Sequence, residues 1–341
     1  MNKILVTGGT GLLGSHLIYK LLSRGEAVKA TCRKSSNRDI VRKVAAYYTP
    51  GAEELFKKIE WIECDLSDPA DLSLAMSDAR LVYHCAAMVS FESGDNEKII
   101  KNNTAVTSNI VKACLENKIS KLCHVSSVAA LGGSDGELTI NEESRWNSEK
   151  PHPAYNTSKY LSEQEVWNGI SQGLNAVIVL PSIILGPGDW KRSSSAIFGT
   201  IAGGLPFYTD GIKAYVDVND VADAMILLME SGISGEKFIL SSENLTNQKV
   251  FSMIAQNLGV RKPFIKIPRF IGPFLPPVIK MIRAFSGKKL PLTKDILNAA
   301  WTRIGYDNSK IKERTGFRLT EIEKSVEYIA SIFIKERKIT R

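Results

Sequence analysis

The chain lacks the marks of secreted, disulfide-bonded and membrane-spanning proteins. Its first residues contain no basic segment followed by an apolar stretch and a small-residue cleavage site, so we expect no secretion signal. No apolar run reaches the length that spans a bilayer. The five cysteines, without Cys-x-x-Cys spacing, argue against a disulfide framework. Because each lies within or beside an apolar run, we expect buried free thiols and a cytoplasmic location.

Histidine is also scarce. The chain contains only His16, His84, His124 and His152, and no carboxylate or cysteine completes a metal-ligand spacing around them. We therefore expect no metal site. The nucleophile triads of hydrolases find no support either.

The net charge of +8 is concentrated in one segment. Residues 261–289 contain eight basic residues and no acidic one, which accounts for the whole excess. Their apolar neighbours are mainly aliphatic and several prolines interrupt the segment, so we expect no nucleic-acid partner. We interpret the segment as a wall of a substrate domain. A contact with a membrane surface and a lid that controls lipid access are the two alternatives. The basic residues are Arg261, Lys262, Lys266, Arg269, Lys280, Arg283, Lys288 and Lys289.

What is present is an alternation of short apolar runs with longer helical patterns. A chain of 341 residues, 44% of them hydrophobic, can bury a large core. Short β-branched runs between helices are typical of βαβ units. We therefore predict an α/β fold with a doubly wound parallel sheet, the Rossmann architecture. Strands are expected near residues 3–7, 27–32, 59–64, 80–85, 120–126, 174–181 and 236–241.

A glycine-rich turn follows the first predicted strand. Gly9-Thr10-Gly11-Leu12-Leu13-Gly14 satisfies G-x-G-x-x-G, and Gly8, Gly11 and Gly14 equally satisfy G-x-x-G-x-x-G. Both patterns place residues without a Cβ atom where the backbone approaches a pyrophosphate at a helix N-terminus. The helix should begin near Leu12 and end at Gly25, a plausible C-cap residue. We predict that residues 8–14 bind a dinucleotide.

The end of the second strand indicates which dinucleotide is preferred. An NAD-binding chain is expected to carry an acidic residue there, about 20 positions after the glycines, to accept the ribose 2′-hydroxyl. This chain has Arg33 and Lys34 instead. A guanidinium pairs with the 2′-phosphate of NADP, which a carboxylate would repel. We predict NADP(H) in preference to NAD(H).

The composition of the chain changes after about residue 181, where glycine and proline become frequent. The pattern of residues 214–242 favours a return of the chain to the first domain. We predict an NADP-binding domain made of residues 1–180 and 214–242. A smaller, discontinuous α/β substrate domain would comprise residues 181–213 and 243–341.

The order of motifs resembles the extended short-chain dehydrogenase/reductase family of the NAD-dependent epimerase/dehydratase superfamily, and within it the dihydroflavonol-4-reductase-like reductases. The resemblance covers nearly the whole chain. "TGGTGLLG" matches T-G-x-x-G-x-x-G, "CDLSD" and "VYHCAA" are similar to two cofactor-contacting segments, and "LPSIILGPGD" resembles the segment beside the nicotinamide. "HVSSVAALG" supplies a serine and "YNTSK" a tyrosine and lysine. "NNTAVTSNIV" is similar to N-V-x-G-T-x-N, although Thr104 and Val106 depart from it.

Position distinguishes two Tyr-x-x-x-Lys pairs. About one such pair is expected by chance in a chain of this composition. Tyr155 and Lys159 follow Ser127, with Tyr155 standing 28 residues after the serine. Tyr306 and Lys310 have the same spacing but no such serine before them, so we interpret that pair as structural.

The resemblance implies the roles of five residues. Tyr155 would give a proton to a carbonyl oxygen held by Ser127, with Ser126 as the alternative serine, while hydride comes from NADPH. Lys159 would hold the nicotinamide ribose hydroxyls. Independently of the resemblance, a cation four residues away on the same helical face predicts a lowered pKa of Tyr155. Asn103 would anchor a water or a backbone turn in a proton relay.

The resemblance also implies further cofactor contacts and an assembly. A homodimer would form on the helices near residues 103–116 and 154–170. The implied cofactor contacts are Asp65 and Leu66 at the adenine, Ala86 and Ala87 after the fourth strand, and Pro181 near the nicotinamide.

The residues at the serine position and around Pro181 also bear on other reactions of the family. Dehydratases of the family place Thr-Asp-Glu at the serine position, where this chain has no carboxylate. A nucleotide-sugar epimerase with retained NAD(P) stays open, although Pro181-Ser182 replaces its usual asparagine. A non-catalytic NADP(H) sensor also stays open, although such proteins typically lose the tyrosine or lysine. We predict an NADP-dependent oxidoreductase acting on an uncharged or weakly polar ketone or aldehyde.

Overall fold

A parallel sheet of seven strands forms the centre of the molecule. The computed structural model describes residues 3–49, 51–89, 93–132, 139–274 and 299–339. The strand order is β11-β7-β5-β4-β1-β2-β3, with every neighbouring pair parallel. This sheet confirms the predicted Rossmann architecture, and each of its strands overlaps a predicted one. The strands are β1 (Lys3–Thr7), β2 (Val28–Cys32), β3 (Glu60–Glu63), β4 (Ala79–His84), β5 (Lys121–Val125), β7 (Ala176–Pro181) and β11 (Glu236–Leu240).

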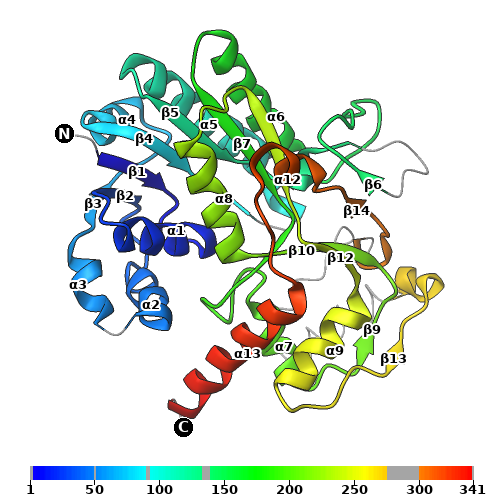
Figure 1. Cartoon of the computed structure of the whole chain (residues 1–341). Coiled ribbons are helices and arrows are strands. Elements are labelled where there is room, and N and C mark those ends of the chain that lie inside the picture. Colours follow the sequence, from blue (N-terminus) through cyan, green and yellow to red (C-terminus); the bar gives the residue numbers. More distant parts are fainter. Residues whose placement is uncertain (1–2, 50, 90–92, 133–138, 275–298, 340–341) are drawn as a thin grey trace.

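Helices cover both faces of the sheet (Figure 1). Side chains of α1, α2 and α8 join one buried core, and those of α4, α5 and α6 join a second core on the opposite face. The inner strands are therefore buried on both sides, which explains their mainly apolar sequences, whereas the edge strand β3 is partly exposed. The helices are α1 (Leu12–Ser23), α2 (Asp39–Tyr48), α3 (Ala52–Lys57), α4 (Pro69–Met76), α5 (Asn96–Glu116), α6 (Ala154–Ser171), α8 (Val218–Glu230) and α12 (Ser309–Thr315).

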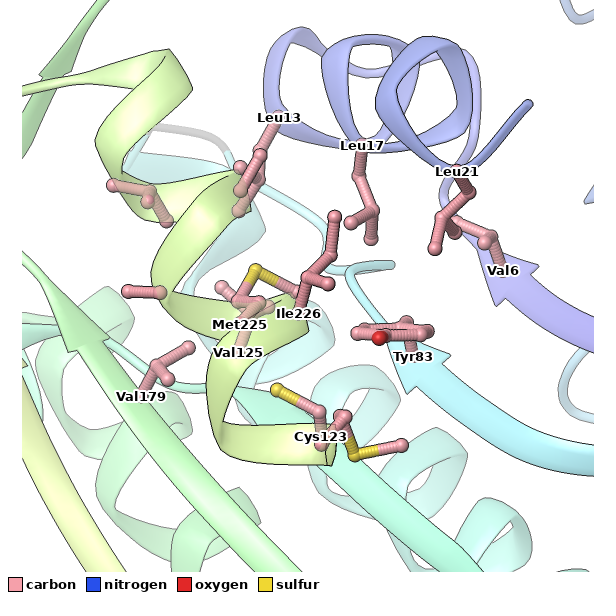
Figure 2. Close-up of a cluster of buried hydrophobic side chains, with 14 of the residues drawn as sticks. Val6, Leu13, Leu17, Leu21, Tyr83, Cys123, Val125, Val179, Met225 and Ile226 are labelled. Carbon is pink, nitrogen blue, oxygen red and sulfur yellow. The ribbon is translucent and has the colours of Figure 1, made fainter. Parts of the chain in front are cut away.

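The first helix is fixed against the sheet by its leucine stripe. Figure 2 shows Leu13, Leu17 and Leu21 of α1 directed toward the space between α8 and the strands. Each buried leucine contributes roughly 1.5–3 kcal/mol by leaving water. The helix begins at Leu12 as predicted, and Gly25 has a φ of +82°, the left-handed conformation that ends a helix. The start of α1 is thus held in place against β1.

The C-terminal part of the chain adds smaller units around a third buried core. A three-stranded sheet in the order β12-β10-β8 packs with α7, α9 and α13. Thr246 caps α9 through a hydrogen bond from the Lys249 amide. The elements are β8 (Ile183–Leu185), α7 (Ala196–Ala202), β10 (Ile212–Asp217), β12 (Glu243–Thr246), α9 (Asn247–Asn257) and α13 (Ile322–Ile339). Two-stranded pairs and short 3-10 turns complete them: β6 (Thr139–Ile140) with β14 (Gly305–Tyr306), β9 (Phe207–Tyr208) with β13 (Ile265–Lys266), η1 (Ser93–Asp95), η2 (Val128–Ala130) and η3 (Arg269–Phe274).

The predicted domain boundaries stay a prediction, although β10, α8 and β11 lead the chain back to the edge of the large sheet. Within the described residues, no helix combines the length and apolarity needed to cross a membrane. Of the basic segment, residues 261–274 belong to the described part of the chain, whereas Lys280, Arg283, Lys288 and Lys289 lie outside it.

The sheet order determines where a ligand can bind. β1 pairs with β2 on one side and with β4 on the other, so the connections after β1 and β4 run in opposite directions. A crevice opens at the carboxyl ends of parallel strands where the order reverses. The predicted glycine turn follows β1 and the Ala86 segment follows β4, so both lie at this position.

Candidate active site

The glycine turn after β1 is packed so tightly that two of its positions exclude a side chain. Gly8 has a φ of +69°, and a Cβ atom there would lie 2.6 Å from the Ala86 amide nitrogen. A Cβ atom on Gly14 would lie 2.3 Å from the Gly8 carbonyl oxygen. At Gly9 the obstacle is only the flexible end of Ile18. The structure therefore favours G-x-x-G-x-x-G, the second of the two spacings, as the pattern the turn requires.

The same turn leaves the N-terminus of α1 available to an anion. Gly11 is the N-cap residue, and no side chain caps the first helical amides. The first turn of α1 contains no acidic side chain. Free amides and the helix dipole favour a phosphate at this point. Residues 8–14, with Thr10, Leu12 and Leu13 among them, thus fit the diphosphate of a dinucleotide.

Two other segments enclose this turn. Ala86 lies against Gly8, and its amide donates to Thr7 Oγ1 at 3.3 Å. On the other side, a Cβ atom on Gly188 would lie 3.1 Å from a methyl group of Leu12. The segment after β8 therefore reaches the start of α1. Ala87 continues the strand-end loop, and Pro181 ends β7 in the same sheet.

The far end of the crevice carries the predicted adenosine contacts. Arg33 and Lys34 follow β2 and are exposed, while the Arg33 carbonyl accepts a hydrogen bond from the Ser36 amide at 2.9 Å. The Asp65 carboxylate accepts hydrogen bonds from the Ser67 side chain and amide, which lower its pKa, and the charge of Arg33 adds to this. Leu66 packs at the edge of the second core. Arg33 and Asp65 thus lie at the same end of the sheet, as predicted.

The catalytic candidates lie where α6 faces the end of β5. Tyr155, Lys159 and Glu163 are four residues apart along α6 and therefore share one face of the helix. Lys159 Nζ donates to the Val125 carbonyl at 2.9 Å, and Ser126 Oγ donates to Glu163 Oε2 at 3.1 Å. A hydrogen bond joins Ser127 to Tyr155. Three successive residues at the end of β5 are held by one helix face.

The two serines have different partners. Ser126 is buried, and its hydroxyl donates to Glu163, which is buried as well. Ser127 accepts a hydrogen bond from the Ala129 amide at 3.1 Å and also reaches Tyr155. Of the two serines, Ser127 has the geometry to share a substrate oxygen with the tyrosine.

The electrostatics of the tyrosine differ from the prediction. Burial raises the pKa of Tyr155 above its ordinary value, and the hydrogen bond with Ser127 only partly opposes this. The ammonium of Lys159 is directed to the Val125 carbonyl. Burial also lowers the pKa of Lys159, to about 8. The net shift of the tyrosine pKa is therefore upward, opposite to the expected lowering, because burial dominates it, and Tyr155 is protonated at neutral pH.

Asn103 of α5 is buried and contacts both the loop after β4 and α6. Its side-chain oxygen accepts from the Met88 amide at 2.8 Å, and its amide donates to the Met88 carbonyl at 2.9 Å. The same amide donates to Ser158 Oγ at 3.2 Å. Asn103 therefore holds the loop after β4 and links it to α6, while its part in a proton relay stays a prediction.

Two buried histidines support the strand ends. His84 shares a hydrogen bond of 2.8 Å with Thr7, whose hydroxyl accepts from the Ala86 amide. Burial lowers the pKa of His84 to about 3 and the pKa of His124 well below its ordinary value. Both rings are therefore neutral. Among the described residues, no group of three potential metal ligands comes together.

The second Tyr-x-x-x-Lys pair has different surroundings. Tyr306 lies in β14, and its backbone exchanges hydrogen bonds with the Asn244 side chain. Lys310 forms an ion pair of 3.2 Å with Glu236 and lies over the Phe238 ring. These contacts fit the structural role assigned to this pair.

Sequence reasoning missed the cluster around Glu163. This buried carboxylate accepts from Lys237 Nζ at 3.0 Å and from Trp167 Nε1 at 3.2 Å, besides Ser126. The sequence does show that Glu163 stands four residues after Lys159. Its partners Ser126, directly after β5, and Lys237, in β11, are however remote in sequence. Glu163 connects the catalytic face of α6 to the edge of the sheet.

Comparisons with known proteins agree with this geometry. A model of the NAD dependent epimerase/dehydratase family matches residues 4–241. The chain belongs to this family. A putative dihydroflavonol 4-reductase from Synechocystis is 28% identical over 94% of this chain and 91% of its own length. Sterol demethylase protein B from Methylococcus capsulatus is 29% identical over 77% of each chain.

Solved structures of the epimerase/dehydratase fold extend over the whole chain. The crystal structure of gox2253 is 30% identical, covers 98% of this chain and 99% of its own, and has a TM-score of 0.81. UDP-glucose 4-epimerase from Thermotoga maritima, 21% identical over 98% of this chain and 99% of its own with a TM-score of 0.74, shares the fold. The predicted resemblance is confirmed, and the chain is an NAD(P)-dependent enzyme of the short-chain dehydrogenase/reductase type.

Proposed function

We propose that this protein is an NADP(H)-dependent reductase that converts a ketone or aldehyde to an alcohol. The observation that carries the proposal is the hydrogen-bonded pair of Ser127 and a protonated Tyr155 at the end of β5, with Lys159 one helical turn further along α6. A neutral phenol can donate a proton, as carbonyl reduction requires, and no carboxylate stands at the serine position as elimination would require.

The residues divide the work of reduction. Bound NADPH would supply hydride to the carbonyl carbon. Ser127 hydrogen-bonds the carbonyl oxygen, and Tyr155 gives that oxygen its proton. Lys159 is cationic below about pH 8 and stabilises the phenolate that remains. Asn103 holds the Met88 turn beside this site.

The preference for NADP(H) is part of the proposal. Arg33 and Lys34 are exposed at the end of β2, and no carboxylate replaces them there. Arg33 can form a bidentate pair with a 2′-phosphate. Substituting Arg33 by Ser should weaken NADPH binding while leaving NADH binding nearly unchanged; equal effects on both would refute the preference.

Several relatives support a small organic carbonyl substrate. Their names include dihydroflavonol 4-reductase from Gerbera hybrida, anthocyanidin reductase from Arabidopsis thaliana and vestitone reductase from Medicago sativa. The nucleotide-sugar epimerases among the solved structures are less similar in sequence than gox2253. We propose an uncharged or weakly polar ketone or aldehyde as the substrate, and a homodimer formed through α5 and α6.

The test follows NADPH absorbance with a panel of ketones, aldehydes, flavonoids, steroids and nucleotide sugars. Tyr155→Phe should abolish turnover and leave NADPH affinity nearly intact. Tyr306→Phe, at the other Tyr-x-x-x-Lys pair, is the matched control and should keep full turnover. An isomerised nucleotide sugar without net NADPH consumption would establish the epimerase instead, and tight NADPH binding without any product would establish a sensor.

A further inference from the structure

One end of the molecule exposes apolar and basic side chains together. We call it the β9–β13 surface, and it is formed by the two-stranded pair and the η3 turn that follows. A contiguous group of exposed apolar side chains marks an interaction site on a protein surface. The apolar members are Phe207, Phe264, Ile265 and Phe270, exposed by 43%, 52%, 41% and 73%. The basic members are Arg261, Lys262, Lys266 and Arg269, all exposed.

Backbone hydrogen bonds hold this surface in place. β13 pairs with β9 so that Ile265 stands opposite Phe207. The amides of Phe264 and Ile265 both donate to the Pro206 carbonyl at 2.9 Å. The Trp301 indole donates to the Ile267 carbonyl at 2.9 Å, which ties the strand to a distant part of the chain. The apolar side chains are therefore presented outward by ordered backbone.

The charge of the surface has one sign. Four basic side chains belong to it, and among the described residues the carboxylate paired with them is Asp210, 3.1 Å from Lys266. No acidic residue occurs anywhere in residues 261–289. The guanidinium of Arg261 lies 3.9 Å from the centre of the Phe264 ring. The partner must therefore be anionic and must also accept apolar side chains.

We propose that the β9–β13 surface docks on an anionic phospholipid bilayer. Lipid acyl chains accept phenylalanine and isoleucine side chains at the headgroup boundary, while headgroup phosphates attract the lysines and arginines around them. A nucleic acid is the competing partner: Arg261 covers one face of the Phe264 ring, which leaves that face unable to stack on a base, and the binding experiment decides between the two partners. β9 and β13 lie beyond α9, away from β1–β3 (Figure 1), so docking leaves the glycine turn accessible.

The proposal does not depend on the reductase activity and is tested by binding alone. The full chain would be mixed with phosphatidylcholine vesicles with and without phosphatidylserine, and the bound fraction measured by co-sedimentation. We expect binding only to the phosphatidylserine vesicles, with release by salt. Each lost basic charge should weaken binding roughly fivefold.

Two variants separate the charge from the apolar contribution. Lys262→Gln with Arg269→Gln should weaken binding to anionic vesicles roughly 25-fold, and Phe264→Ser with Phe270→Ser at least tenfold. Matched controls change equally exposed residues elsewhere. These are Leu74→Ser on α4, where the leucine is 69% exposed, and Lys58→Gln with Lys312→Gln. Both controls should bind as the unmodified chain does, and NADPH binding should survive in every variant because none touches the glycine turn.

Several results would overturn the proposal. They are absence of binding to anionic vesicles, binding that the control variants reduce as much as the surface variants, and a phenylalanine variant that changes only the oligomeric state. A charge variant that loses nucleic-acid binding while the phenylalanine variant keeps it would assign the surface to nucleic acid instead.

Discussion

Replacing Glu163 by alanine should disturb the segment directly after β5, which contains Ser126 and Ser127. The carboxylate is buried and accepts three hydrogen bonds, from Ser126, Trp167 and Lys237. Ser126 directly precedes Ser127, so the Glu163 hydrogen bond restrains the backbone that presents the hydroxyl proposed to be catalytic. We expect Glu163 to be a positioning residue, which acts on the reaction through this strand end.

The expected loss of stability follows from the hydrogen-bond partners that lose Glu163. Removing one member of a buried charged pair costs about 3–5 kcal/mol. Lys237 is 22% exposed and can turn toward water, so the cost should fall to about 2–3 kcal/mol in the free energy of unfolding. A small displacement of a catalytic group is expensive, so kcat should fall roughly tenfold or more while KM changes little. Glu163→Gln keeps an acceptor for Ser126 and should recover most of kcat.

The assay compares urea unfolding with steady-state kinetics on a substrate from the carbonyl panel. Glu165→Ala is the matched control, because Glu165 lies on the same helix but bonds to Ser108 of α5 at 2.8 Å. Its kcat should stay unchanged. If Glu163→Ala loses stability and keeps its kcat, the carboxylate only supports the fold, and the positioning argument is refuted.

Three further predictions concern the cofactor crevice. Gly14→Ala should weaken NADPH binding at least tenfold in a fluorescence titration, because a Cβ atom would meet the Gly8 carbonyl oxygen at 2.3 Å; Gly232→Ala, with open space around it, should bind normally. Lys159 loses its proton near pH 8, so the rate of reduction should fall above that pH, and Lys159→Arg, which stays charged, should move the fall upward. The pKa of Lys159 is about 8 in the folded chain, against an ordinary value of 10.5. Between these two pH values the unfolded chain therefore binds more protons at this group than the folded chain does. The contribution of Lys159 to the free energy of unfolding should accordingly rise from pH 8 to pH 10.5, as measured by urea titrations. Flat profiles in both experiments would contradict the assignment.

The sheet could be predicted because its signals are local. Most strands of the large sheet are short, mainly apolar runs, and burial on both faces favours such runs. The edge strand β3, Glu60–Glu63, is the exception, with an exposed glutamate at each end. The glycine turn was equally readable, since its backbone geometry limits the residue types allowed. The structure adds which glycines are required: a side chain on Gly8 or Gly14 would collide with backbone, whereas Gly9 faces a movable methyl group.

The electrostatics of the site could not be predicted, because they depend on contacts between distant segments. The four-residue spacing predicted that Lys159 would lower the pKa of Tyr155. The structure instead directs the ammonium to the Val125 carbonyl, 34 residues away in the chain, and burial decides the pKa of both groups. The Glu163 cluster was missed for the same reason, since Lys237 stands 74 residues further on.

The two Tyr-x-x-x-Lys pairs show what spacing can and cannot establish. Both pairs have the same separation, so a helical or turn geometry could bring either tyrosine near its lysine. In one pair, Lys310 is drawn to Glu236 and the Phe238 ring, which fixes it as part of the packing between α12 and β11. In the other, Lys159 finds no carboxylate among its hydrogen-bond partners and keeps its charge beside the end of β5. Whether a lysine of this spacing stays available for chemistry therefore depends on whether a carboxylate pairs with it. The tertiary fold, and not the local spacing, determines whether such a carboxylate lies nearby.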